Sequence, residues 1–299
     1  MNIEQELGLK LKGGIKKDEP MAKHTSWQVG GPADYFSCPS DLDELLEIVR
    51  LSYKYQLPLY ILGNGTNLLV LDGGIRGLVV KIGAAFSYIK HEHDTLVTGA
   101  GTPLAYMARS AAEIGLSGLE FAIGIPGSLG GALIMNAGAF GSYVGERVSS
   151  VKLVDFSGEL ITLSREDLSF GYRTSNLIGR GILVEAVLEM KKGEPAKSFE
   201  AMEHFSEERR NRHPVLPSAG SVFRNLPDQP AGLIIEKAGG KGMQIGGAAV
   251  SEEHANFIVN TGHATAADIL NLIRAVRQLV KDNYNLELQP EVRIIGEES

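Results

Sequence analysis

The sequence predicts an α+β fold, and three observations point to it. Helical and strand patterns follow one another along the chain without regular alternation, which disfavours a doubly wound parallel sheet. Most apolar segments are short and are bounded by glycine turns, as short strands are. Glycine is also unusually frequent, with 36 of the 299 residues, or about 12% against a usual share near 7%.

The first half of the chain contains two predicted helices with strands between them. A capping box at 40–43 begins the first helix, and Pro58 ends it. The second helix is expected to have Thr102 as its N-cap and Pro103 as its first residue, and to stop at Gly115. Strands are predicted at 59–62, 68–71 and 78–80, separated by turns at 63–67 and 73–74.

The second half opens with a predicted hairpin at 151–163, whose turn is Ser157-Gly158. A long strand follows at 181–190, and the polar stretch 191–197 is the best candidate for a linker. The remaining predicted elements are a charged helix at 199–211, a helix capped by Thr265 and a last strand at 291–295.

Composition restricts the class of protein. With 43% hydrophobic and 22% charged residues, the chain can bury a sizeable core, which argues against disorder. The formal charge of −7 disfavours binding to nucleic acid, which needs a basic face. The single cysteine, Cys38, allows neither an internal disulfide nor a cysteine metal cluster, and no histidine pair has convincing ligand spacing. We therefore expect a cytoplasmic protein without a metal.

No segment has the character of a signal peptide or a membrane span. Residues 1–20 mix both signs of charge and contain no apolar stretch. The uncharged run 121–145 is long enough to span a bilayer, but its seven glycines and one proline would leave backbone groups unsatisfied in lipid. We predict buried glycine-rich loops there, and no membrane partner.

Two glycine-rich segments, at 63–67 and 124–131, are candidates for binding an anion. Each follows an apolar stretch and is expected to present consecutive backbone N–H groups, which can hold a pyrophosphate without a basic side chain. Neither fits the Rossmann or P-loop pattern, and each alone could be a turn at a sheet corner. Amides for a bound nucleotide could come from Asn64, Asn67 and Asn136, and hydroxyls from Thr66 and Ser128.

These segments belong to a series of motifs that resembles a known family. The series is HTSWQVGGPAD at 24–34, GNGTN at 63–67, GIPGSLGG at 124–131 with NAG at 136–138, YR at 172–173, GSVF at 220–223 and QPEVR at 289–293. In this order they resemble the UDP-N-acetylenolpyruvoylglucosamine reductases, flavoenzymes of peptidoglycan-precursor synthesis. The resemblance extends from residue 24 to residue 295. Within the family, the chain resembles the shorter subclass, which lacks an inserted tyrosine loop.

The resemblance implies an FAD-binding domain of the vanillyl-alcohol-oxidase (PCMH) type at 24–195, with two α+β subdomains at 24–85 and 86–195. It implies an α/β substrate domain at 196–299, whose last strand could pack back on the FAD domain. The implied reaction is reduction of UDP-N-acetyl-3-O-(1-carboxyvinyl)-glucosamine to UDP-N-acetylmuramate, with non-covalent FAD and NADPH as reductant. The partners are then these small molecules, and we expect a monomer.

The resemblance also implies roles for individual residues. Arg173, Ser221 and Glu291 match the catalytic residues of the family. The residues that match its cofactor contacts are Gly63, Asn64, Gly65, Thr66, Asn67, Gly124, Ile125, Pro126, Gly127, Ser128, Gly130, Gly131, Asn136, Gly138 and Arg293. The residues expected to contact substrate are Tyr172, Arg212, Asn225 and His254.

The implied chemistry suits these residue types. Hydride from the reduced flavin reaches the enolpyruvyl group, and the charge that develops flows into its carboxylate. Arg173 and a protonated Glu291 could stabilise that charge, and Ser221 could donate the proton. Taken without the family, Ser221 is an ordinary turn hydroxyl, Arg173 an exposed strand-edge residue and Glu291 a solvated carboxylate.

The sequence alone leaves two other functions open. The first is a flavin oxidase or dehydrogenase with a covalently tethered flavin, although no histidine occupies a recognisable tethering position. The second is a flavin or nucleotide-sugar sensor without catalytic activity. Consumption of NADPH that depends on the enolpyruvyl sugar would separate the reductase from both.

Overall fold

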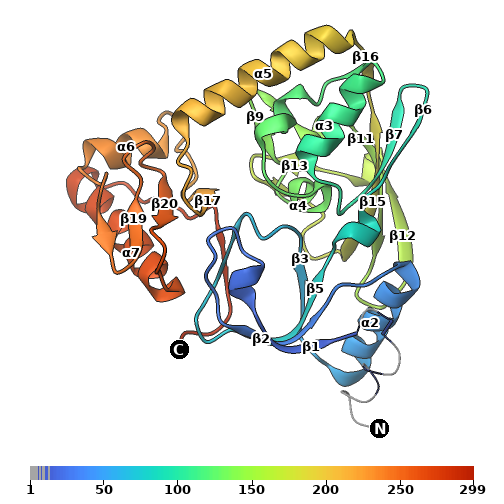
Figure 1. Cartoon of the computed structure of the whole chain (residues 1–299), viewed down its shortest axis with the longest axis horizontal. Coiled ribbons are helices and arrows are strands. Elements are labelled where there is room, and N and C mark those ends of the chain that lie inside the picture. The colour runs from blue at the N-terminus through green and yellow to red at the C-terminus, as the bar shows by residue number, and fades with distance from the viewer. Residues whose placement is uncertain (1–5, 7, 9–10, 13) are drawn as a thin grey trace. The chain divides into compact units, whose positions relative to one another are not determined.

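The computed structural model describes residues 6, 8, 11–12 and 14–299 (Figure 1). The chain forms two compact units, each built from several segments. Unit 1 comprises the described part of Met1–Lys17 with Tyr35–Asn64 and Gly77–Arg209, and unit 2 comprises Asp18–Asp34, Gly65–Arg76 and Arg210–Ser299. The functional domains at 24–195 and 196–299 stay a prediction, and the expectation for residues 1–20 falls partly outside the described residues.

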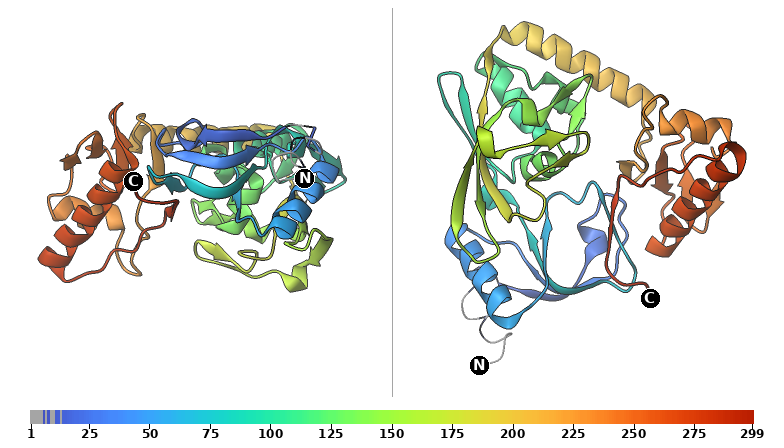
Figure 2. Two further views of the ribbon diagram at one scale, coloured as in Figure 1. Left: turned by 90° about the horizontal axis from the view of Figure 1, so that it is seen from below. Right: turned by 180° about the vertical axis from the view of Figure 1, so that it is seen from behind.

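Unit 1 is built on a five-stranded antiparallel sheet with the strand order β12-β11-β15-β7-β6 (Figure 1; seen from behind in Figure 2). The predicted hairpin is confirmed, because β11 (Val148–Val154) pairs with β12 (Leu160–Ser164). The predicted long strand is β15 (Ile182–Glu189), which pairs with β11 and β7 (Thr95–Gly99). The apolar side chains of β11 and β15 are buried against the helices of this unit.

The helices of unit 1 follow their sequence patterns, but their starts differ by one residue from the predictions. Asp41, not Ser40, caps α2 (Leu42–Tyr55) by accepting the Glu44 N–H at 2.8 Å. Helix α3 (Leu104–Glu113) begins after Pro103. The Thr102 hydroxyl instead bonds to the backbone of Tyr88 at 3.1 Å, so it is not available as a cap.

The predicted linker at 191–197 is wrong. Residues Lys191–Lys192 form β16, which pairs with β8 (Leu116–Ser117), and α5 (Pro195–Arg212) begins three residues later. The Gly193 N–H also donates to the Gly115 carbonyl at 2.8 Å. Main-chain pairing, which the polar composition does not reveal, therefore fixes this stretch.

The other strands are short and lie in the second sheet or at turns. The second sheet has the order β1-β2-β5-β3, in which β3 and β5 are parallel. The uncharged run 121–145 contains two short strands among its glycine-rich loops, but it also contains a short helix at 129–134 that was not predicted. The bounds are β1 (Lys16–Pro20), β2 (Pro32–Ser37), β3 (Leu59–Leu62), β5 (Ile75–Lys81), β6 (Ile89–Glu92), α4 (Leu129–Ile134), β9 (Gly138–Ala139), β10 (Ser142–Tyr143), β13 (Phe170–Gly171) and β14 (Thr174–Ser175).

Unit 2 has its own sheet, with the order β17-β20-β19-β18, and its own core. Trp27 is fully buried in that core and donates its indole N–H to the Ile258 carbonyl at 2.7 Å. The last strand pairs in parallel with β4. The bounds are β4 (Leu68–Val70), β17 (Ser218–Ser221), α6 (Ala231–Lys237), β18 (Gln244–Ile245), β19 (Ala248–Val250), β20 (Phe257–Asn260), α7 (Ala266–Tyr284) and β21 (Arg293–Ile295).

A carboxylate from a distant loop caps α7. The predicted cap at Thr265 is confirmed, and it forms a capping box with Asp268. In addition, the two Asp72 carboxylate oxygens accept the N–H groups of Ala266 and Ala267 at 2.9 and 2.8 Å. Among the described residues, the helices are all too short or too polar to cross a membrane.

Replacing Asp72 with alanine is expected to destabilise the protein by about 1–2 kcal/mol, because two helix N–H groups lose their acceptor and the helix dipole loses its counter-charge. Thermal or denaturant unfolding measures this change. The exposed Asp228 provides the control, since its alanine variant should stay within about 0.5 kcal/mol of the parent. Equal effects of the two substitutions would contradict the capping role.

Candidate active site

The two glycine-rich segments meet within unit 1. A Cβ atom added at Gly63 would lie 2.7 Å from the Ser128 hydroxyl oxygen, which is closer than packed atoms allow. Ser128 is itself only 2% exposed, so it cannot easily move aside. Glycine is therefore required at 63 for the two loops to approach each other. Residues 65–67 of the first segment belong to unit 2.

The second segment is anchored by its own main chain. The N–H groups of Leu129 and Gly130 donate to the carbonyls of Thr102 and Ala100 at 2.9 and 2.8 Å, and the Ile125 N–H donates to Ala122. These three amides are therefore not open donors, and the expected row of free N–H groups is interrupted. What remains is a rigid loop with little side-chain bulk, which a ligand can approach closely.

A cationic side chain lies against this loop. A Cβ atom added at Gly124 would lie 2.8 Å from Cδ of Arg209, on α5. Burial lowers the pKa of the Arg209 guanidinium, although an arginine stays charged near neutral pH. Among the residues that the structure describes, none forms a hydrogen bond or ion pair with this guanidinium. A positive charge of this kind is suited to an anionic ligand.

The Asn136 side chain, predicted as a cofactor contact, bonds to the main chain of two loops. It is 6% exposed, and its amide donates to the Gly171 carbonyl at 3.0 Å while accepting the Gly145 N–H at 3.1 Å. The nitrogen and the oxygen of the Asn136 side chain therefore link two loops of unit 1. Asn136 thereby holds the strand β13, which ends immediately before Tyr172 and Arg173.

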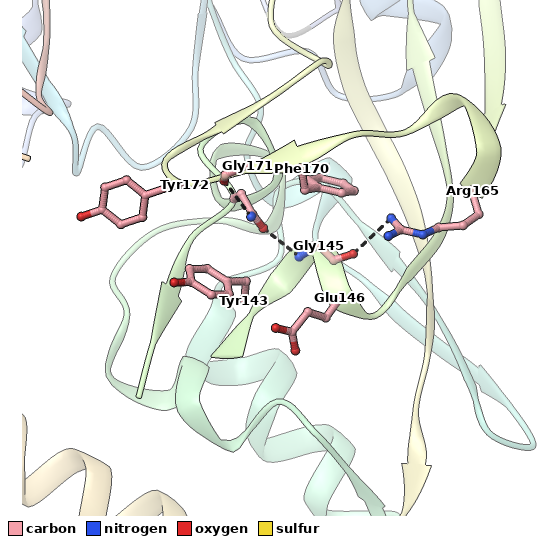
Figure 3. A pocket seen from close by; sticks show the side chains of 8 residues that line it. Tyr143, Gly145, Glu146, Arg165, Phe170, Gly171 and Tyr172 are labelled. Atoms are coloured by element: carbon pink, nitrogen blue, oxygen red, sulfur yellow. Dashed lines mark hydrogen bonds between the residues drawn. The ribbon is translucent and has the colours of Figure 1, made fainter. Parts of the chain in front are cut away.

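A pocket of about 350 Å³ opens beside Asn136 (Figure 3). Its polar groups are the hydroxyls of Tyr143 and Tyr172, the Glu146 carboxylate and the Arg165 guanidinium, which donates to the Gly145 carbonyl at 3.3 Å. Both tyrosine hydroxyls point to the same side of the pocket (Figure 3). Of these residues only Tyr172 was predicted as a site residue, because the others belong to no recognisable motif.

Arg173 is in an unusual backbone conformation. Its φ of 55° lies in the left-handed region, which non-glycine residues rarely adopt. Its guanidinium donates to the Gly138 carbonyl at 3.3 Å and lies 5.6 Å from the centre of the Tyr172 ring. The structure therefore brings the predicted catalytic Arg173 next to Gly138 and Tyr172 in unit 1.

Ser221 and Glu291 come together within unit 2. Ser221 ends β17, and the next residue, Val222, accepts the Glu291 N–H on its carbonyl at 2.7 Å. Two residues further, the Arg224 N–H donates to the Gln289 carbonyl at 2.9 Å. These bonds join two segments that lie 70 residues apart in the sequence, which spacing alone could not show. The third predicted catalytic residue, Arg173, belongs to unit 1.

The unit 2 part of the first glycine segment lies beside Glu291. The Asn67 amide donates to the Glu291 carbonyl at 3.4 Å, and the Asn67 carbonyl accepts the Arg293 N–H at 3.0 Å. Gly65 is buried, Thr66 is half-buried and the Arg293 side chain is exposed. The structure therefore groups Asn67, Glu291 and Arg293, while Asn64 is exposed in unit 1.

The predicted substrate residues of unit 2 differ in their surroundings. Arg212 and Asn225 are exposed, and the side-chain oxygen Oδ1 of Asn225 accepts the Ala231 N–H at 3.0 Å. His254 is half-buried, its Nδ1 accepts the Asn256 N–H at 3.1 Å, and burial lowers its pKa. The neutral ring therefore carries its proton on Nε2, where it can act as a donor.

Comparison with known proteins gives a consistent result along the chain. Residues 33–164 match a family model described as FAD binding domain, and residues 211–295 match the C-terminal domain of UDP-N-acetylenolpyruvoylglucosamine reductase. The reductase of that name from Bacillus velezensis is 44% identical over 299 residues, which cover 99% of this chain and 98% of the relative. The one from Anoxybacillus flavithermus is 46% identical, with 98% of each chain covered.

A solved structure agrees with these relatives. The UDP-N-acetylenolpyruvylglucosamine reductase from Thermus caldophilus matches with a TM-score of 0.81 at 34% identity, covering 92% of this chain and 97% of that chain. This match and the FAD-binding model confirm the predicted fold class. Because relatives above 40% identity cover nearly the whole chain, the protein belongs to the UDP-N-acetylenolpyruvoylglucosamine reductase family and is an FAD-dependent oxidoreductase.

Proposed function

We propose that this chain reduces UDP-N-acetyl-3-O-(1-carboxyvinyl)-glucosamine to UDP-N-acetylmuramate in the cytoplasm, for peptidoglycan synthesis, with NADPH as reductant. The observation that carries the proposal is the hydrogen bond between Glu291 N–H and Val222 O, which places a carboxyl residue beside the residue after Ser221. A hydroxyl donor and a carboxyl residue on two hydrogen-bonded segments suit protonation of a carbon next to a carboxylate. Family membership supports the same substrate.

The residues around the two glycine segments fit FAD. Side-chain bulk is excluded at Gly63 and Gly124, and Arg209 places an unpaired positive charge beside the second loop. The proposed cofactor residues are those of 63–67 and 124–131 predicted from the sequence, with Asn136, Gly138 and Arg293, and Arg209 is added to them. Bound FAD supplies the hydride for the reaction.

The three proposed catalytic residues have separate tasks. Arg173 holds the substrate carboxylate, because its planar, permanently charged guanidinium presents donors in a fork that matches a carboxylate. Ser221 gives its proton to the carbon beside that carboxylate. Glu291, in its protonated form, donates a hydrogen bond to the charge that develops on the carboxylate.

The remaining assignments concern the substrate and the organisation of the chain. Tyr172, Arg212, Asn225 and His254 contact the nucleotide sugar, with the neutral His254 acting as a hydrogen-bond donor through Nε2. The functional domains are 24–195 for FAD and 196–299 for the substrate. The protein acts as a monomer on these small molecules.

Replacing Ser221 with alanine should leave reduction of the flavin by NADPH within about twofold of the parent. Reoxidation of the flavin by the enolpyruvyl sugar in this variant should slow by about 10²–10⁴-fold, because the proton donor is lost. Stopped-flow absorbance of the flavin measures both half-reactions. Ser218→Ala, in the same strand, is the control and should leave both rates unchanged. An S221A enzyme that reoxidises at the parental rate would remove Ser221 from the mechanism.

Replacing Arg209 with methionine should weaken FAD binding by about 10–100-fold, since a charge-assisted hydrogen bond contributes about 1.5–3 kcal/mol. Titration of the apoprotein with FAD, followed by flavin fluorescence, gives the dissociation constant. Arg210→Met changes the neighbouring, exposed arginine of the same helix and should alter the constant by less than about threefold. Unchanged affinity in R209M would show that Arg209 does not face the cofactor.

A further inference from the structure

We propose that Asn256 is a positioning residue for proton transfer, which holds the segment that links Ser221 to Glu291. The inference rests on the proposed function, because it concerns the same two catalytic groups. No sequence motif assigns this role to Asn256, which lies in unit 2 immediately before β20. Its hydrogen bonds and its burial carry the argument.

The Asn256 side chain is 2% exposed and bonds twice to a single residue of the Ser221 loop. Its Nδ2 donates to the Phe223 carbonyl at 2.8 Å, and its Oδ1 accepts the Phe223 N–H at 2.9 Å. The amide thus forms both bonds that a paired strand would form with Phe223. A third bond joins the same segments, from the Val222 N–H to the Asn256 carbonyl at 2.8 Å.

The amide is needed here because the ordinary strand pairing ends at Ser221. Ser218 lies opposite Val259 and Ser221 lies opposite Phe257, so three residues of β17 advance against two of β20. Gly220 accommodates the extra residue with a φ of +75°, which a side chain would resist. Beyond this bulge, the Asn256 side chain replaces the next pair of ladder bonds.

The opposite edge of the same segment holds Glu291. Val222 accepts the Glu291 N–H at 2.7 Å, Arg224 donates to Gln289 at 2.9 Å, and Phe223 forms a bridge with Pro290. Residues 222–224 therefore lie between Asn256 on one side and 289–291 on the other. A displacement of Phe223 would move the Ser221 hydroxyl and the Glu291 carboxyl together, and an error of about 1 Å in such a site can cost about 100-fold in rate.

A purely structural role for Asn256 is the competing explanation, and strand β20 offers a matched control for it. Asn260 is 5% exposed and also bonds only to the main chain, donating to Trp27 O at 2.9 Å and accepting the N–H groups of Gly262 and Ala264. It lies at the other end of β20, away from Ser221. Structural loss alone should therefore affect Asn256 and Asn260 variants alike.

The test compares Asn256→Ala and Asn256→Asp with Asn260→Ala in the FAD-loaded enzyme. Both alanine variants should lower the unfolding midpoint. Only N256A should slow flavin reoxidation by the enolpyruvyl sugar, by about 10–100-fold, while reduction by NADPH and FAD affinity stay within about twofold of the parent. The rate should fall at saturating sugar, because the positioning of the reacting groups, not binding, is impaired.

Asn256→Asp provides a readout that loss of stability would not give. A buried aspartate has a raised pKa, and its protonated form can again donate to the Phe223 carbonyl while accepting the Phe223 N–H. Reoxidation in N256D should therefore recover towards the parental rate near about pH 5.5 and fall about tenfold or more by about pH 8, relative to the parent at each pH. This variant also decides the question if N256A fails to fold.

The outcomes separate the two proposals. Equal effects of N256A and N260A on reoxidation, or a flat relative pH profile in N256D, would overturn the role of Asn256 while the parental reaction stands. A parental enzyme whose reduced flavin is not reoxidised by the enolpyruvyl sugar would instead overturn the proposed function. Selective slowing in N256A together with recovery at low pH in N256D would support the inference.

Discussion

The main-chain pairing of residues 289–295 is the constraint on which unit 2 depends. Gln289 and Glu291 pair with the segment after Ser221, and Arg293–Ile295 form β21 against β4. One short segment near the end of the chain therefore joins two loops that are more than 150 residues apart. Glu291 lies between these two sets of bonds, so the backbone around it is fixed from both sides.

In a similar way, unit 1 depends on the close approach of Gly63 to the loop at 124–131. The loop at 124–131 is held by main-chain bonds to Ala100 and Thr102, and Gly63 leaves room for Ser128 of that loop. The surface that results is rigid and lacks bulky side chains at the contact. Because three amides of this loop are already bonded, we propose that Arg209 supplies the charge for an anionic ligand, which would let an acidic protein bind a dinucleotide.

Local pattern was sufficient to predict much of the fold. The second helix, which was expected to stop at Gly115, the hairpin turn at 157–158 and the Thr265 cap depend on near neighbours, and the structure confirms these elements. The stretch 191–197 was wrongly predicted as a linker, because its strand pairing with Leu116–Ser117 involves residues some 75 positions away. The start of α3 differs from the prediction by one residue because Thr102 bonds elsewhere, and that of α2 because Asp41 is the cap.

The candidate site was predictable only through the family's motifs. Ser221, Glu291 and Arg173 have no local signature, and the proximity of Ser221 to Glu291 arises from long-range strand pairing. Arg209 and Asn256, whose roles are proposals, were not predicted from the sequence because a basic helix face and a buried amide are ordinary features. Their meaning comes from what they contact: Gly124 in one case and the Phe223 backbone in the other.

The central claim is that the Ser221 hydroxyl and the Glu291 carboxyl act on one substrate group. A crystal structure of the FAD-loaded enzyme with the enolpyruvyl nucleotide sugar tests it most directly. The account predicts the serine oxygen within hydrogen-bonding reach of the carbon to be protonated, with Glu291 at the adjoining carboxylate. A substrate bound with either group facing away from the enolpyruvyl unit would contradict it.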